Sequence, residues 1–143
     1  MITKILKNQE ILKNLYYNQL DKLRETFDFN DQEKTFNEME NIATNLNKEI
    51  TKHFELQEQL KNQINPKIDK LILENMLVKD ILVRMSNKII DGAQKKDINI
   101  FSFFDDFEEI LKAYLKKEKG LFIQEIKNNT TPQEQEKIKE ILN

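Results

Sequence analysis

Glycine and proline, the residues that most often interrupt regular secondary structure, are scarce in this chain, which has two of each among 143 residues. Apolar side chains recur every three or four positions along most of the sequence, which is the spacing of one face of an α-helix. We therefore predict an all-α protein with helices at about residues 2–26, 32–64, 66–90, 100–128 and 131–142. Four long helices with short connections favour an up-down-up-down antiparallel four-helix bundle with a short C-terminal fifth helix, in a single domain of residues 1–143.

Local signals mark the ends of these helices. The segment Asp28–Asp31 contains Asn and Asp residues, whose side chains cap helix N-termini, so we expect it to separate the first two helices. Pro66 ends the second helix and is suited to the first position of the third. The sequence Thr131-Pro132-Gln133-Glu134 has the threonine, proline and glutamate of a capping box and predicts the start of the last helix. The stretch 91–97 is the only other predicted loop.

The composition excludes several classes of function. The chain has no cysteine, which removes disulfides, thiolate nucleophiles and sulfur-ligated metal sites, and its one histidine is His53. A net charge of −2 gives no basic field for nucleic acid. The sequence shows no nucleophile–base pair and no convergent acid–base set, so we predict that the protein is not an enzyme.

The sequence also indicates where in the cell the protein is located. Its first ten residues, MITKILKNQE, are charged and do not resemble a signal peptide. No apolar run approaches the length of about 18 residues that a membrane span needs. We expect a soluble, cytoplasmic, bacterial-type protein, monomeric or homodimeric, that binds neither membrane nor nucleic acid and has a protein partner as yet unknown.

The predicted inward stripes of the four long helices are interrupted by polar residues. A helix rises about 1.5 Å per residue, so in antiparallel helices these interruptions fall at one level of the bundle. Polar side chains in a core cost free energy unless they are hydrogen-bonded to partners. We therefore predict a mutually bonded polar layer made of Asn8, His53, Gln57, Asn75, Tyr114 and Glu118. The stripe of the fourth helix is predicted to continue through Leu121.

The positions of this layer carry a resemblance to the hemerythrin-like (HHE cation-binding) family. The segment HFELQEQL, which starts at His53, is similar to the family's His-Phe-x-x-Glu-Glu-x-x-Leu pattern. YLKKEKGLFIQEI, from Tyr114, is similar to its His-x-x-x-Glu-Glu-x-x-Leu-Phe pattern. LKNQEILKNL, LILENMLVKDIL and TTPQEQEKIKEI resemble the first helix, the third helix and the tail helix in the same order. The resemblance spans the whole chain and implies a four-helix bundle with a di-iron centre.

Most of the implied iron ligands are replaced in this sequence. The resemblance places histidines where this chain has Asn8, Asn75 and Tyr114, and a carboxylate where it has Gln57. Only His53 and Glu118 match the family's ligand types. Amides are weak iron ligands, so we expect no metal and no other cofactor.

The sequence therefore predicts a degenerate hemerythrin-like domain without a di-iron centre, which binds a partner or has a sensory or regulatory role. Two alternatives to this prediction stay open. The first is an iron- or oxygen-binding protein with an atypical site, in which His53 and Glu118 are joined by Glu58 and Glu74. In that alternative Tyr114 is a candidate phenolate ligand. The second is an unrelated helical chaperone or adaptor whose likeness to the family is only helical periodicity; it predicts polar residues scattered over different levels.

Overall fold

The computed structural model describes residues 2–142, which form helices and connecting loops without a β-strand. The all-α class is therefore confirmed. The elements follow in the order α1 (Thr3–Lys13), the π-helical segment η1 (Asn14–Leu20), α2 (Lys22–Glu25), α3 (Gln32–Glu58), α4 (Pro66–Gln94), the 3₁₀ segment η2 (Ile98–Phe101), α5 (Ser102–Lys117), the π-helical segment η3 (Glu118–Phe122), α6 (Ile123–Asn128) and α7 (Pro132–Leu142).

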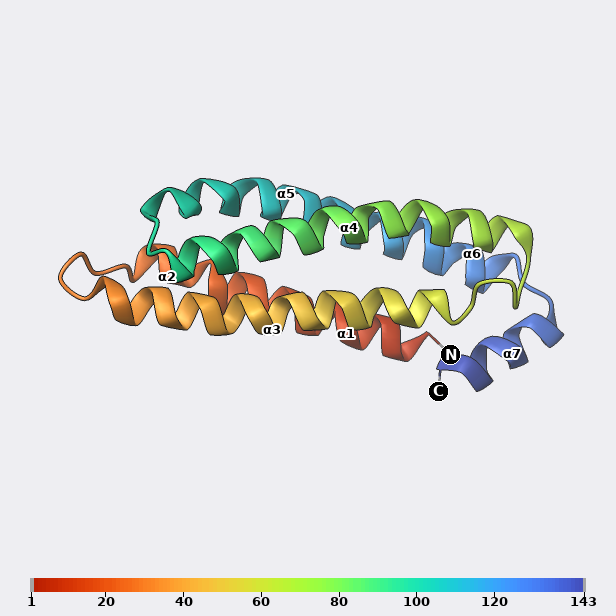
Figure 1. The fold of residues 1–143 in the computed structure, drawn as a ribbon. Coiled ribbons are helices and arrows are strands. Elements are labelled where there is room, and N and C mark those ends of the chain that lie inside the picture. The colour runs from red at the N-terminus through yellow and green to blue at the C-terminus, as the bar shows by residue number, and fades with distance from the viewer. Residues whose placement is uncertain (1, 143) are drawn as a thin grey trace.

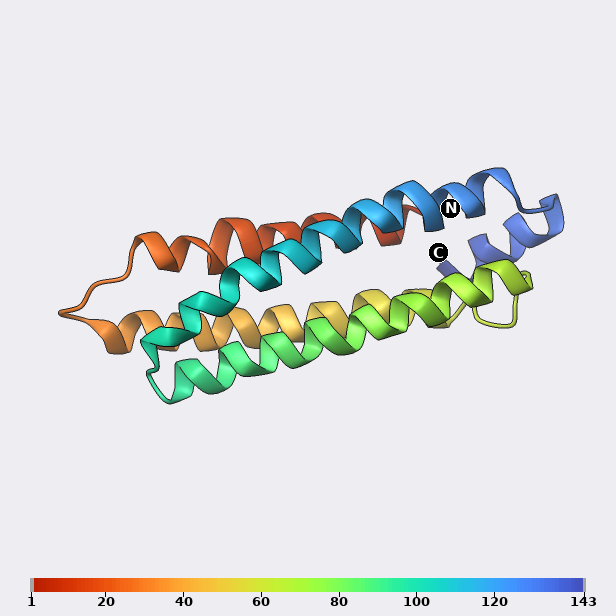
Figure 2. The same ribbon diagram turned by 90° about the horizontal axis from the view of Figure 1, so that it is seen from above.

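These helices lie along one long axis (Figures 1 and 2). Helices α3 and α4 run beside each other over most of their length, and the α1–α2 and α5–α6 stretches run along their other side. Helix α7 folds back next to the beginning of α1, so the two ends of the described chain are close together. No helix within residues 2–142 is long and apolar enough to cross a membrane.

Two of the predicted helix starts are capped by side chains, and the capping box at the second was expected. The side chain of Asn65 accepts a hydrogen bond from the backbone N–H of Ile68 at 3.0 Å, directly before Pro66 at the start of α4. Thr131 and Glu134 form a reciprocal capping box at α7, with bonds of 2.9 and 3.1 Å between side chain and backbone. The backbone N–H of Thr131 donates to the carboxyl of Glu134, and this bond, together with side-chain bonds from Asn65 and Thr131, holds the pKa of that carboxyl below its usual value.

The predicted cap of α3 is wrong. Asp31 occupies the cap position but its side chain makes no capping bond. Asp28 instead accepts a hydrogen bond from the backbone N–H of Asn30 at 2.8 Å. The aspartate side chain thus stabilises the turn itself, a competing use of the same residue type.

Two helix ends also differ from the prediction. Helix α3 ends at Glu58, not near Ile64, because the chain leaves the helix through Asn62, which has a left-handed backbone (φ 64°). Helix α4 continues to Gln94, past the predicted end at Ile90, and its loop turns at Lys96 (φ 56°).

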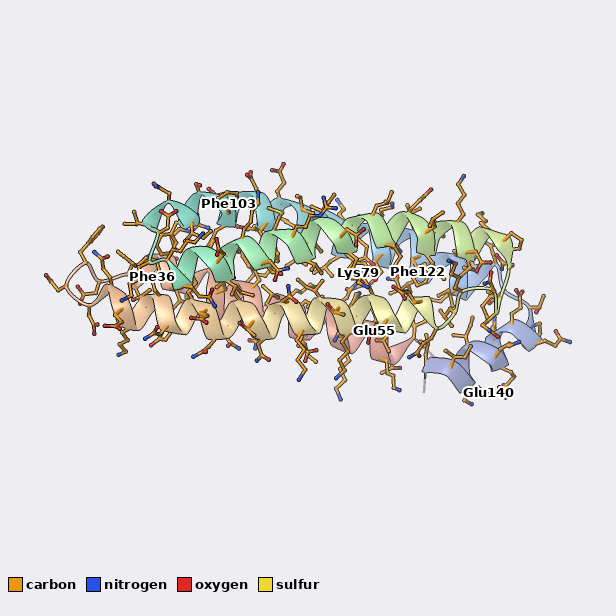
Figure 3. The ribbon with its side chains drawn as sticks, viewed as in Figure 1. Phe36, Glu55, Lys79, Phe103, Phe122 and Glu140 are labelled. Carbon is orange, nitrogen blue, oxygen red and sulfur yellow. The ribbon has the colours of Figure 1, made fainter. Side chains whose placement is uncertain are left out.

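The apolar core has two parts. The larger cluster extends from Leu12 and Phe54 to Phe36 and Phe104 at the end with the 26–31 loop. The smaller cluster joins the start of α1, the start of α4, α6 and α7 through Ile2, Ile5, Leu60, Ile68, Ile72, Phe122, Ile123, Ile126, Ile138 and Leu142. Figure 3 shows Phe36 near the loop end and Phe122 in the half that contains α7.

The π-helical segment η3 changes the inward stripe of the last long helix. Leu121, predicted to face the core, is 55% exposed, and Phe122 is buried in its place. A π-helix places an extra residue in a turn, so the inward face moves on by one residue. Tyr16 is buried against Phe107 of α5, and its hydroxyl donates to the Phe104 carbonyl at 2.8 Å.

Candidate functional site: a buried polar layer

All six polar residues predicted to share one level meet in the interior, between the two apolar clusters. Their exposed fractions are 5% or less. Each long helical stretch contributes, so the layer ties the helices together. They are Asn8 from α1, His53 and Gln57 from α3, Asn75 from α4, and Tyr114 and Glu118 from the end of α5 and the start of η3.

The carboxylate of Glu118 lies at the centre of this layer. His53 Nε2 is 2.9 Å from Oε1 and 2.8 Å from Oε2. The Tyr114 hydroxyl donates to Oε2 at 2.5 Å, and the side-chain amide of Gln57 donates to the same oxygen. A further donor, Gln9 Nε2, lies 2.7 Å from Oε1. Hydrogen bonds from several sides are what a buried carboxylate needs to replace its lost hydration.

The imidazole of His53 is held at both of its nitrogens. Nδ1 lies 2.6 Å from Asn8 Oδ1, while the amide nitrogen of Asn8 donates to Glu49 Oε2 at 3.3 Å. A carboxylate only accepts, so Glu49 turns the nitrogen of Asn8 outward and its oxygen toward the ring. Nδ1 is therefore the donor to Asn8 Oδ1, and Nε2 faces the carboxylate of Glu118.

The other side of the layer is a chain of neutral groups. Asn75 Nδ2 donates to Gln57 Oε1 at 2.8 Å, and the nitrogen of Gln57 lies 2.5 Å from the Tyr114 hydroxyl. Burial and then the negative charge of Glu118 raise the pKa of Tyr114 well above its ordinary value. Tyr114 therefore stays a neutral donor to Glu118 under ordinary conditions.

Sequence reasoning missed one member of the layer. Gln9 is 2% exposed and donates both to Glu118 and to the Leu115 carbonyl, the latter at 3.3 Å. Its spacing of three and seven residues to Leu12 and Tyr16 is the signal that would have placed it on the inner face.

The start of the π-helical segment coincides with the layer. Glu118 is the first residue of η3. π-Helical turns inside α-helices are frequent at functional sites, and here the wider turn separates the inward positions Glu118 and Phe122.

The two carboxylates of the atypical iron site lie apart from this layer. Glu58 pairs with Lys79 at 3.3 Å and Glu74 with Lys117 at 3.7 Å, each with a side chain more than two-fifths exposed. Within residues 2–142, no group of three or more His, Cys, Asp or Glu side chains is arranged to hold a metal ion. The structure thus brings His53 and Glu118 together but not with Glu58 or Glu74.

Comparison with known proteins leaves the family unassigned. No protein-family model, curated protein or solved structure matches this chain significantly.

Proposed function

We propose that this chain is a non-enzymatic binding domain with a regulatory or sensory role, built as a hemerythrin-like up-down-up-down four-helix bundle. In this proposal a hydrogen-bonded layer occupies the level at which the resembled family holds its two irons. The domain then acts by binding a partner or ligand at its surface.

The observation that carries the proposal is the saturation of the layer. Both nitrogens of His53 are engaged, and both oxygens of Glu118 already accept hydrogen bonds. Within residues 2–142, no fully buried side-chain nitrogen or oxygen lacks a hydrogen-bond partner. In a di-iron site such lone pairs bind the metal ions instead, and the hydrogen-bond partners of each ligand lie on the side away from the metal. The bonding of the layer therefore favours a structural role.

The single level of the polar residues also bears on the helical chaperone or adaptor. That alternative predicts polar residues scattered along the helices, whereas side chains from all four long stretches bond to one another here. The gathering of these polar side chains at one level supports the bundle arrangement of the resembled family.

The second candidate function is an iron- or oxygen-binding protein. It is favoured by one contact, the 2.8 Å approach of His53 Nε2 to Glu118, since these two residues match the ligand types of the resemblance. Iron there would need new ligands and the loss of at least one of the bonds described above.

Elemental analysis of protein purified without chelator, together with its visible spectrum, tests the two functions. The proposed function predicts less than one-tenth of an iron atom per chain and no visible band. Stoichiometric iron that is lost in His53→Leu but kept in the surface variant Glu55→Gln would overturn it and favour the second function.

A further inference from the structure

A groove between the α1–η1 and α5–η3 stretches has four lysines in its lining. We call it the α1–α5 groove. Its volume is about 310 Å³, at the lower end of the range of ligand pockets, about 300–1,000 Å³. It is lined by Gln9, Lys13, Tyr17, Lys112, Leu115, Lys116 and Lys119.

The rim of this groove is positively charged in a chain whose net charge is −2. Lys13 pairs with Glu10 at 3.3 Å. Within residues 2–142, the ammonium groups of Lys112, Lys116 and Lys119 form no ion pair. Three lysines that are not paired with a carboxylate, on the rim of one groove, attract an anion.

The floor of the groove is apolar. Leu115 is 4% exposed, and Tyr17 is half-buried with its ring edge-to-face against Tyr16. Lysine side chains add methylene stems to such a surface while their ammonium groups stay in water. The groove therefore offers apolar contact below and positive charge above.

The inner wall of the groove belongs to the buried layer. Gln9 lines the groove, and its amide nitrogen donates inward to Glu118 at 2.7 Å. A molecule that contacts Gln9 therefore touches a side chain bonded to the central carboxylate.

We propose that the α1–α5 groove binds a small organic anion with an apolar body, an acyl or aryl carboxylate. The proposal rests on the proposed function, for which it names a ligand class. The apolar part lies on Leu115 and Tyr17, and the carboxylate lies among the lysines. The small volume selects against long-chain lipids.

A second lysine-lined cavity is the natural comparison. It lies between α1 and α3, has a volume of about 430 Å³, and is lined by Lys4, Lys7, Asn8, Ile11, Lys52 and Leu56. Its wall residue Asn8 is bonded to the Glu49 carboxylate, which places a negative charge beside the cavity. The inner wall of the α1–α5 groove is also bonded to a carboxylate, but that carboxylate, Glu118, is 1% exposed and is itself paired with His53.

Fluorescence titration of the full chain with 1-anilinonaphthalene-8-sulfonate, an apolar anion, tests this site. We expect saturable binding that decanoate displaces, whereas decanol and inorganic phosphate do not. Lys116→Glu weakens binding at least tenfold. The matched variants Lys7→Glu, in the second cavity, and Lys139→Glu, on the exposed face of α7, change binding less than twofold.

Each contrary result is distinguishable. Equal affinity in Lys116→Glu, or a loss confined to Lys7→Glu, overturns the assignment of the groove. Displacement by hexaglutamate but not by decanoate also overturns it and points to an acidic peptide. Thermal melts of every variant verify that the fold is intact. Iron in the purified protein contradicts the proposed function, whereas failure of probe binding in iron-free protein contradicts only the ligand inference.

Discussion

Glu118 is the residue on which the buried layer depends. Its carboxylate is 1% exposed and takes hydrogen bonds from Gln9, His53, Gln57 and Tyr114. A buried charge is tolerated when it is paired and fully hydrogen-bonded, and becomes costly when one partner is removed. The consequences of single substitutions therefore follow from what each leaves unpaired.

Replacement of His53 by leucine is expected to destabilise the protein. It removes the partner of Glu118 and leaves Asn8 Oδ1 without its donor, for a loss of about 3–5 kcal/mol in the free energy of unfolding. The double variant His53→Leu/Glu118→Gln removes the buried charge as well and should recover part of the loss. Urea denaturation of the double-mutant cycle measures this coupling. Additive single effects would contradict the pairing.

The stability of the protein is expected to fall in alkaline solution because of Tyr114. Its pKa is raised by burial and by Glu118, so the folded state keeps the hydroxyl proton while the unfolded chain loses it. The stabilisation is complete below about pH 10 and is lost as the pH rises above that value, by up to about 1.4 kcal/mol per pH unit. In the Tyr114→Phe variant, the free energy of unfolding measured by urea titration should fall less steeply between pH 10 and 11. An unchanged slope would count against a buried, neutral phenol.

At the scale of elements, the ends and irregular turns of the helices do most to position the layer. Caps at Asn65 and Thr131 set where α4 and α7 begin. The π-helical segments η1 and η3 shift the inward faces of the two helical stretches that carry Gln9 and Glu118. Helix α4 and the segment η2 are in close contact at the end of the molecule that contains the 26–31 loop.

That close contact depends on Gly92. A Cβ at this position would lie 2.7 Å from Cδ1 and 3.0 Å from Cβ of Ile100. Gly92→Ala should therefore lower the free energy of unfolding by about 1–3 kcal/mol through overpacking. Gly120→Ala is the matched control, because no atom beyond its chain neighbours and its own helix backbone lies within 4 Å of an added Cβ, and it should be neutral or stabilise by up to about 1 kcal/mol. Equal melting temperatures for the two variants would show that α4 and η2 can separate freely.

The π-helical segment η3 makes a prediction about deletions. If η3 holds one residue more than an α-helical turn, deletion of the exposed Leu121 should let the turn close as an α-helix with Phe122 still facing inward. Deletion of Ala113, within regular α5, should rotate Glu118 away from the layer and unfold the protein or lower its melting temperature far more. Circular dichroism melts compare the two. An equal loss of melting temperature in the two deletion variants would mean that η3 does not hold one residue more than an α-helical turn.

Across the whole molecule, the polar layer lies between two apolar clusters, and α7 completes the smaller one. Ile138 and Leu142 of α7 are fully buried against the start of α1, the start of α4 and α6. Helix α7 is thus part of the apolar core on one side of the layer.

Loss of packing under α7 should therefore affect the stability of the entire chain. Ile138→Ala is expected to cost about 2–5 kcal/mol, the range for buried aliphatic truncations. Ile141→Ala, on the half-buried side of the same helix, should cost clearly less. Chemical denaturation followed by far-ultraviolet circular dichroism measures both. A separate early transition in Ile138→Ala would show that α7 unfolds independently.

The sequence by itself determined the helical class, the capping box of α7, the start of α4 and the membership of six polar residues in one layer. These features follow from local rules, namely the period of the helix, side chain–backbone bonds within a few residues, and the cost of an unpaired polar group in a core.

Tertiary structure decided the rest. Phe122 replaced Leu121 on the inward face, because a π-helical turn shifts a helix face by one residue only when packing on neighbouring helices favours the wider turn. Gln9 and Tyr16 bond to groups of η3 and α5, so their contacts form only once these helices pack together. Which nitrogen of His53 meets which oxygen likewise depends on distant partners, Glu49 through Asn8 on one side and Glu118 on the other. Most hydrogen bonds of the layer join residues that are about 40 to 110 positions apart in the sequence. Local sequence patterns do not predict such contacts, so the bonding of the layer is visible only once the helices are packed.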